Sequence, residues 1–352
     1  MRSSGIGGQA VLEGIMMRHG DEYSIAVRKP DQSIEVRVEP YKSVIGCAPL
    51  LRIPFIRGIF NFIDSLVVGI KCLMYSATFF EDEEEGDKKP LTEEERKQKE
   101  AKEKKEEKAM MFGSLAFSLV IAIVVFMMGP YFLTNYLLKS MENKYLVNLI
   151  EALVRIAIFL IYLFVISRMK DIQRTFMYHG AEHKCINCVE HGLPLNPDNV
   201  LKSSRLHKRC GTSFLFFVVI VSAILLMLVQ SDSHLMRILW RLILIPIIAG
   251  ISYEIIRLAG SSDNAFVNLL SKPGMALQKL TTREPDRAQA EVAIAAVEAV
   301  FDWKAYLGQE FGWQDPDAPA EQTEEPARSA ADEAPLTDLP PTEASVCREA
   351  HV

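Results

Sequence analysis

The chain has 352 residues, of which 49% are hydrophobic, and its formal net charge at pH 7 is −6. Ten acidic and only two basic residues follow from Gln314 onward, so the rest of the chain is slightly basic and is not an acidic protein. Because this basic excess is small, we expect no nucleic-acid partner. The six cysteines are scattered and no secretory signal precedes them, which excludes a disulfide framework and indicates a reducing compartment.

The first 45 residues predict a small β-rich unit on the cytoplasmic side. Residues 25–28 and 34–38 alternate like strands around a turn at 29–32. The glycine-rich segment 7–14 precedes them. No strand-to-helix context with Lys-Ser/Thr follows it, so its glycines predict tight turns in preference to phosphate binding.

Residues 46–80 predict an amphipathic helix at the membrane interface. Arg57, Asn61, Asp64 and Lys71 fall along one helical stripe of an otherwise apolar segment. A fifth transmembrane span is the weaker interpretation, because its three charges would need partners. The next segment, 81–108, is a charged linker or an exposed helix, and we assign it no chemistry.

Four transmembrane helices are predicted, at about 109–138, 145–168, 211–231 and 235–258. The first and third contain uncharged runs longer than the roughly 20 residues that cross a bilayer. The second and fourth carry charges, and Glu151 and Arg155, four residues apart, can pair on one face. Lys and Arg residues are frequent at 88–108 and 168–209 and rare in the other two connections, which predicts cytoplasmic termini.

The C-terminal part divides into two segments. Residues 261–313 are predicted to be cytoplasmic and to contain an amphipathic helix within 285–303 that packs on the β-rich unit. The tail, 314–352, is rich in Pro, Ala and Glu and is expected to be disordered.

The segment 169–210, between the second and third spans, carries the residues that suggest chemistry. His179, Glu182 and His183 form the pattern H-x-x-E-H, which on a helix directs two imidazoles and a carboxylate to one point. Inverted zinc peptidases use this order of residues, with the carboxylate as a general base. Glu182 is therefore the candidate catalytic residue.

Two metal sites compete for this segment. In the first, His179 and His183 join His207 or Cys210 around a divalent metal, with one position left open. In the second, Cys185, Cys188, His207 and Cys210 close a structural zinc knuckle. A third interpretation has no metal, because His and Glu at membrane surfaces often contact only water and headgroups.

Four segments of the chain resemble the bacterial YqhQ-like family. They are residues 7–18, 178–184, 207–214 and 280–285, so the resemblance extends over most of the chain except the linker and the tail. The family consists of uncharacterised multipass membrane proteins that are often described as predicted metal-dependent enzymes. The resemblance implies a bacterial inner-membrane location.

The family pattern also bears on the choice of ligands. It contains the residues that match His179, Glu182, His183, His207, Arg209 and Cys210. It does not require cysteine at positions 185 and 188, which favours the first metal site, with zinc as one candidate metal. The family usually has proline where this chain has Lys208, so the resemblance is weaker at His207.

Two functions follow from these observations. The first is a metal-dependent hydrolase that acts at the cytoplasmic membrane surface on a lipid or a membrane protein. The second is a non-catalytic membrane scaffold or biogenesis factor, suggested by the charged linker, the acidic tail and the striped helix. The sequence also leaves a homo-oligomer open.

Overall fold

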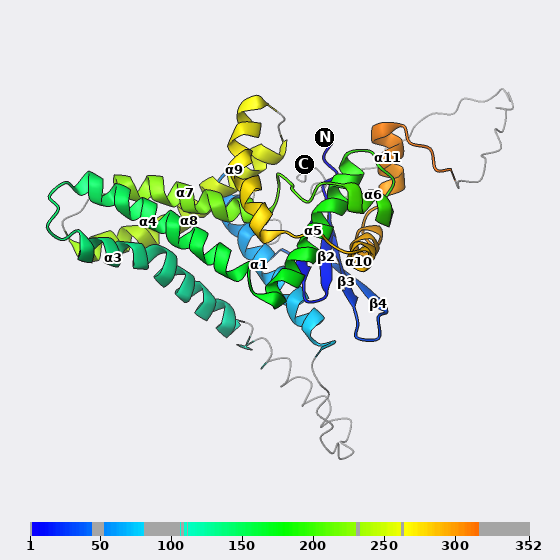
Figure 1. Cartoon of the computed structure of the whole chain (residues 1–352), viewed down its shortest axis with the longest axis horizontal. Coiled ribbons are helices and arrows are strands. Elements are labelled where there is room, and N and C mark those ends of the chain that lie inside the picture. Colours follow the sequence, from blue (N-terminus) through cyan, green and yellow to red (C-terminus); the bar gives the residue numbers. More distant parts are fainter. Residues whose placement is uncertain are drawn as a thin grey trace, which may run out of the picture.

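The computed structural model describes residues 2–43, 53–80, 106, 109–110, 112–229, 233–261 and 264–316. A bundle of long apolar helices forms one side of the molecule, and a small sheet covered by shorter helices forms the other (Figure 1). The prediction of a mainly helical chain with an N-terminal β unit is thus confirmed. The predicted linker, apart from residue 106, and the predicted tail from residue 317 on lie outside the described residues.

Four strands form an antiparallel meander in the order β1-β2-β3-β4. The predicted strands at 25–28 and 34–38 are confirmed as parts of β3 and β4. The segment 7–14 differs from its prediction, because it forms strand β1 and only a two-residue turn before β2. The strands are β1 (Gly7–Val11), β2 (Gly14–His19), β3 (Glu22–Arg28) and β4 (Ile34–Pro40).

Helices cover both faces of the sheet. Helices α5 (Lys170–Glu190) and α10 (Arg287–Glu298) pack on one face, where they share an apolar core with β2 and β3. Helix α10 lies within the predicted segment 285–303 and packs on the sheet as expected. The C-terminal half of α1 (Ile56–Ala77) packs on the other face, through Val68 and Cys72. Burial on two faces explains why β2 is apolar without alternation.

Five helices in the described part of the chain are long and apolar enough to cross a membrane. Four of them lie within a few residues of the predicted spans, and the fifth is α1. The second helix contains a π-helical turn, η2 (Val124–Met128), followed by α3 (Gly129–Leu137). The five helices are Ile56–Ala77, Phe112–Leu137, Lys144–Ile166 (α4), Gly211–Leu228 (α7) and His234–Gly260, which lies within α8 (His234–Ser261).

The charges inside the bundle are paired. The predicted pair between Glu151 and Arg155 forms within α4 at 2.6 Å, and Arg241 of α8 binds the same carboxylate at 2.7 Å. Arg155 Nε also donates to the carbonyl of Phe126 in the π-helical turn, at 3.2 Å. A π-helical turn disturbs the regular pattern of intrahelical hydrogen bonds. A carbonyl group in such a turn can therefore accept a hydrogen bond from a side chain.

The polar stripe of α1 also has partners. Arg57 forms a bidentate ion pair with Glu254 near the end of α8, with Nε 2.7 Å from one carboxylate oxygen. Asp64 accepts hydrogen bonds from Tyr41 and Ser43, at 3.1 and 2.6 Å. The N-terminal end of α1 therefore contacts the bundle, and its C-terminal half contacts the sheet.

The last part of the chain returns to α5. Helix α9 (Ala265–Thr281) packs against α7, and the segment after it crosses α5, with the Arg283 N–H donating to Phe176 O at 2.9 Å. This crossing brings the end of α9 and the centre of α5 together where the bundle meets the sheet. Two short helices, α6 (Pro197–Lys202) and α11 (Trp303–Phe311), complete the described fold.

Candidate metal centre

The H-x-x-E-H motif lies in the middle of α5, as its spacing predicts. From Tyr178 to Glu190 every residue of this helix except His179 is buried. The buried stretch contains histidine, glutamate, lysine and asparagine, and buried polar side chains need partners. The partners come from distant segments, so α5 is where the fold brings polar groups together.

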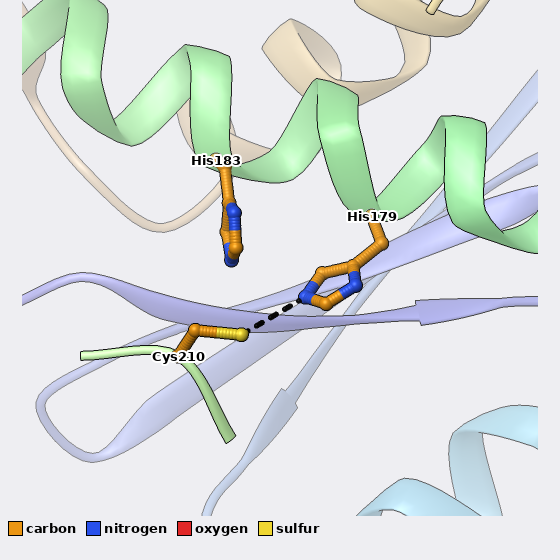
Figure 2. Close-up of side chains that lie close together, drawn as sticks. All are labelled: His179, His183 and Cys210. Carbon is orange, nitrogen blue, oxygen red and sulfur yellow. Dashed lines mark hydrogen bonds between the residues drawn. The ribbon is translucent and has the colours of Figure 1, made fainter. Parts of the chain in front are cut away.

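His179, His183 and Cys210 meet at one point. Each contributes one ligand atom, and these three atoms all lie within 4.8 Å of one another. Cys210 Sγ is 3.3 Å from His179 Nε2, and the two imidazole centroids are 4.4 Å apart. Figure 2 shows both rings extending from α5 toward the thiol. Within the described residues, this is the group of His, Cys and carboxylate side chains with spacing suited to a metal.

Both imidazoles are oriented by backbone carbonyl groups. His179 Nδ1 is 2.9 Å from Thr281 O, and His183 Nδ1 is 2.7 Å from Arg205 O. A carbonyl only accepts hydrogen bonds, so each Nδ1 carries the proton. Nε2 of both rings then faces the other ligand atoms and binds a metal once it has lost its proton, an arrangement that recurs among metal-binding histidines.

Cys210 lies at the N-cap of α7, where its Sγ accepts the N–H of Thr212 at 3.4 Å. Burial raises the pKa of the thiol, but the adjacent imidazoles of His179 and His183 outweigh burial and bring it well below the usual value. The helix N-terminus adds a favourable field for a thiolate. In the same pair, burial lowers the pKa of His179, and the Cys210 charge more than reverses this, raising the pKa to about 9.

Glu182 is buried beside this group. One of its carboxylate oxygens, Oε2, has no hydrogen-bond partner within the described part of the chain and lies 3.9 Å from His179 Nε2. Burial raises the pKa of Glu182, against the opposing effect of His183 and His179. A carboxyl group with a raised pKa is better matched to proton transfer near neutral pH.

Two glycines allow the backbone to approach the motif. A Cβ atom at Gly180 would overlap the carbonyl oxygen of Arg283, where the segment after α9 crosses α5. A Cβ atom at Gly8 would lie 2.6 Å from Met16 O and 3.0 Å from Glu182 Cγ. The glycine at position 8 therefore allows close contact with β2 and with Glu182, and the predicted tight turn is not its role.

His207 lies outside the group of three, although the sequence pattern predicts it among the ligands. Its Nε2 is 3.3 Å from Glu190 Oε2, and its backbone N–H donates to Gln278 at 2.8 Å. Glu190 also accepts from Arg209 and from Ser4. Burial would raise the pKa of Glu190, but the hydrogen bond from His207 and the charge of Arg209 hold it at about 2. This network ties the N-terminal residues to α5 and to the start of α7.

The knuckle of Cys185, Cys188, His207 and Cys210 is not assembled. Cys185 and Cys188 lie in the apolar core beneath α5, and the Cys188 thiol is 3.6 Å from Leu193 O. Burial raises the pKa of both thiols, so these cysteines are packing residues.

Two charged residues near the N-terminus lie apart from the three ligand atoms. Glu13 binds Arg174 and Tyr178, one turn before the motif. Arg18 is stacked on Tyr41.

The donor set fits a zinc ion. Two imidazoles and one thiolate are ligands that zinc commonly takes, and three protein ligands leave a fourth position for water or substrate. One thiolate and the Glu182 carboxylate would balance the double positive charge of a zinc ion held there. The unsatisfied oxygen of Glu182 supplies an acceptor for such a water.

Comparison with known proteins agrees with the resemblance. Residues 53–303 match a family described as "Protein of unknown function (DUF1385)". The chain is 37% identical over 309 residues to "Uncharacterized protein YqhQ" of Bacillus subtilis (strain 168), covering 86% of this chain and 94% of that protein. The chain belongs to the YqhQ-like family. No solved structure matches it significantly.

The family signatures at 178–184 and 280–285 meet in space at Gly180. We predict that Gly180→Ala destabilises the protein by about 1–3 kcal/mol, because the added methyl group displaces the carbonyl of Arg283 and, with it, the nearby carbonyl that holds His179. Thermal unfolding in detergent measures the effect. Gly211→Ala is the matched control, because a methyl group there meets no atom within 4 Å. Equal melting temperatures for the two variants would contradict the prediction.

Proposed function

We propose that this protein is a membrane-embedded, zinc-dependent hydrolase with its site at the cytoplasmic surface. The observation that carries the proposal is the convergence of His179, His183 and Cys210 within 4.8 Å, beside a buried carboxylate with an unsatisfied oxygen. A structural zinc site is usually closed by four protein ligands. Three ligands and a nearby base support a catalytic site instead.

Different residues of the site would have different roles in hydrolysis. His179, His183 and Cys210 would hold the ion, which when bound lowers the pKa of a water molecule and polarises a carbonyl group. Glu182 accepts a proton from the attacking water and later donates it to the leaving group. The backbone carbonyls of Thr281 and Arg205 keep the imidazoles in the required tautomer.

The apolar surface supports a place in the membrane. Large side chains such as Phe117, Ile161 and Leu228 are exposed on the bundle, at 67%, 62% and 75%. Exposed apolar surface of this extent is typical of contact with lipid. The lysine and arginine distribution favours cytoplasmic termini, which puts the sheet and the candidate metal centre on the cytoplasmic side.

Helix α1 is assigned to the interface in this proposal, although its length and composition would also allow a span. Its C-terminal half shares a core with the sheet, and Ser76 Oγ accepts the N–H of Leu12 at 3.1 Å. Its first turn binds Glu254 near the end of α8. Both ends of α1 therefore contact groups that the proposal puts on the cytoplasmic side.

A second candidate function uses the same residues without a metal. Cys210 Sγ lies 3.3 Å from His179 Nε2 at a helix N-terminus, an arrangement found for nucleophilic thiolates. His179 would then act as the base of a thiol-dependent acyl transfer. Zinc binding separates the two, because a thiolate that binds zinc is protected from alkylation by iodoacetamide.

The zinc content tests the proposed function directly. Purified protein is expected to hold about one zinc ion per chain, and His183→Ala to retain less than about a tenth of it, because a ligand is lost. Glu182→Gln should keep the zinc and lower hydrolysis about 10²- to 10⁴-fold. Mass spectrometry of the metal and cleavage of fluorescein-labelled β-casein or phospholipid vesicles are the measurements.

His191→Ala is the control, because His191 is an exposed histidine just after α5. It should keep both zinc and activity. Protein without zinc, in which iodoacetamide modifies Cys210, would instead favour the thiol mechanism. No cleavage by the wild-type protein, together with a Glu182→Gln variant of unchanged phenotype, would favour the non-catalytic scaffold. Unchanged cleavage by Glu182→Gln would reject Glu182 as the base.

The assignment of α1 is tested by labelling of single cysteines at Ile53 and Phe80, which are exposed on either side of the helix. With native cysteines replaced, an impermeant maleimide should leave both positions unlabelled in intact cells and label both in inverted vesicles. A cysteine at Met141, in the connection between α3 and α4, should behave in the opposite way. Opposite labelling of positions 53 and 80 would mean that α1 crosses the membrane.

A further inference from the structure

Strand β1 is an open edge of the sheet, next to the candidate metal centre. It pairs with β2 on one side, and within the described residues no strand lies on its other side. Its first four residues are exposed or half-exposed, and only Val11 is buried. A Cβ atom at Gly7 would meet nothing within 4 Å, so the space over one face of the strand is open at this residue.

The register shows which main-chain groups face outward. Val11 and Gly14 close a two-residue hairpin, so residues 7, 9 and 11 exchange hydrogen bonds with β2. Gly8 and Ala10 therefore point their N–H and C=O groups away from the sheet. Gly8 also lies close to Glu182, because a Cβ atom at position 8 would be 3.0 Å from Glu182 Cγ. Within the described part of the chain, Gly8 O and both main-chain groups of Ala10 have no hydrogen-bond partner.

The two edges of the sheet differ in composition. Strand β4, at the far edge, has the sequence IEVRVEP, whose charges and proline discourage pairing with another strand. Strand β1 has the sequence GGQAV, with no charge and no proline. Soluble domains usually protect an exposed sheet edge from pairing with another strand. An edge that lacks charge and proline, beside a candidate catalytic residue, therefore indicates a binding surface.

We propose that β1 binds an extended polypeptide as an additional strand, which identifies unfolded or locally extended protein as the substrate of the proposed hydrolase. The chemistry in this inference rests on the proposed function, but the binding does not. An extended polypeptide offers main-chain donors and acceptors at the spacing of Ala10 and Gly8, which a lipid does not. Recognition through the main chain tolerates many sequences. A polypeptide paired there passes Glu182, because Gly8 lies against the side chain of Glu182.

Photo-crosslinking tests this binding site without requiring catalysis. The full chain carries Glu182→Gln and a benzophenone amino acid in place of Gly7, where the space is open, or of Val38 on β4 as the control. The probe is β-casein, a polypeptide without a stable fold. We expect crosslinking from position 7 to exceed that from position 38 about fivefold, and Ala10→Pro to lower it by a similar factor, because one main-chain donor is lost.

Equal crosslinking from the two edges would overturn the proposal, whether or not Ala10→Pro folds. Crosslinking from position 7 that a folded Ala10→Pro variant leaves unchanged would also overturn it. Zinc content, measured on the same samples, separates this result from the proposed function. Full zinc without crosslinking rejects the polypeptide substrate alone, and crosslinking without zinc rejects the metal centre and leaves a polypeptide-binding edge.

Discussion

Two backbone carbonyl groups, of Thr281 and Arg205, determine what the histidines of α5 can do. Each accepts the Nδ1 proton of one imidazole, so both rings present Nε2 to the same point. A histidine without such a partner would rotate and exchange tautomers, and three ligand atoms would rarely meet. The segments that carry these carbonyls are therefore as important to the site as the ligands themselves.

The fold explains how these segments reach α5. Helix α7 begins just after Cys210 and belongs to the apolar bundle, whereas α5 rests on the sheet. The buried carboxylate of Glu190 joins the two parts by binding Arg209 and His207, just before Cys210. Removing one partner of such a buried group leaves a charge without compensation, which commonly costs about 3–5 kcal/mol. The site thus depends on the contact between bundle and sheet, and neither part holds it alone.

Sequence reasoning found the elements whose patterns are local. The sequence predicts α5 from the helical spacing of His179 and His183, and α7 from its long uncharged run. Both helices are present, because periodicity and hydrophobicity are local properties of the sequence. The strand β2 was missed, since burial on two faces removes the alternation by which a strand is recognised. Positions 8 and 180 require glycine because Met16, Glu182 and Arg283 approach them closely in the fold. These contacts cannot be read from the local sequence.

The position of His207 illustrates the same limit. Spacing made it an equal candidate with Cys210, but the buried carboxylate of Glu190, seventeen residues away in the sequence, decides which way the ring faces. The carbonyls of Thr281 and Arg205 left no signal at all, because every residue has such a group. The local sequence pattern therefore identifies the motif and two further candidate ligands, His207 and Cys210. Tertiary contacts decide which of the two joins the site.

X-ray absorption at the zinc edge of the purified protein tests the central claim most directly. The account predicts about two nitrogen neighbours at about 2.0–2.1 Å, one sulfur at about 2.3 Å and one light atom from water. The sulfur contribution should vanish in Cys210→Ser. A spectrum with no sulfur, with several sulfurs, or with no bound zinc to observe would contradict it.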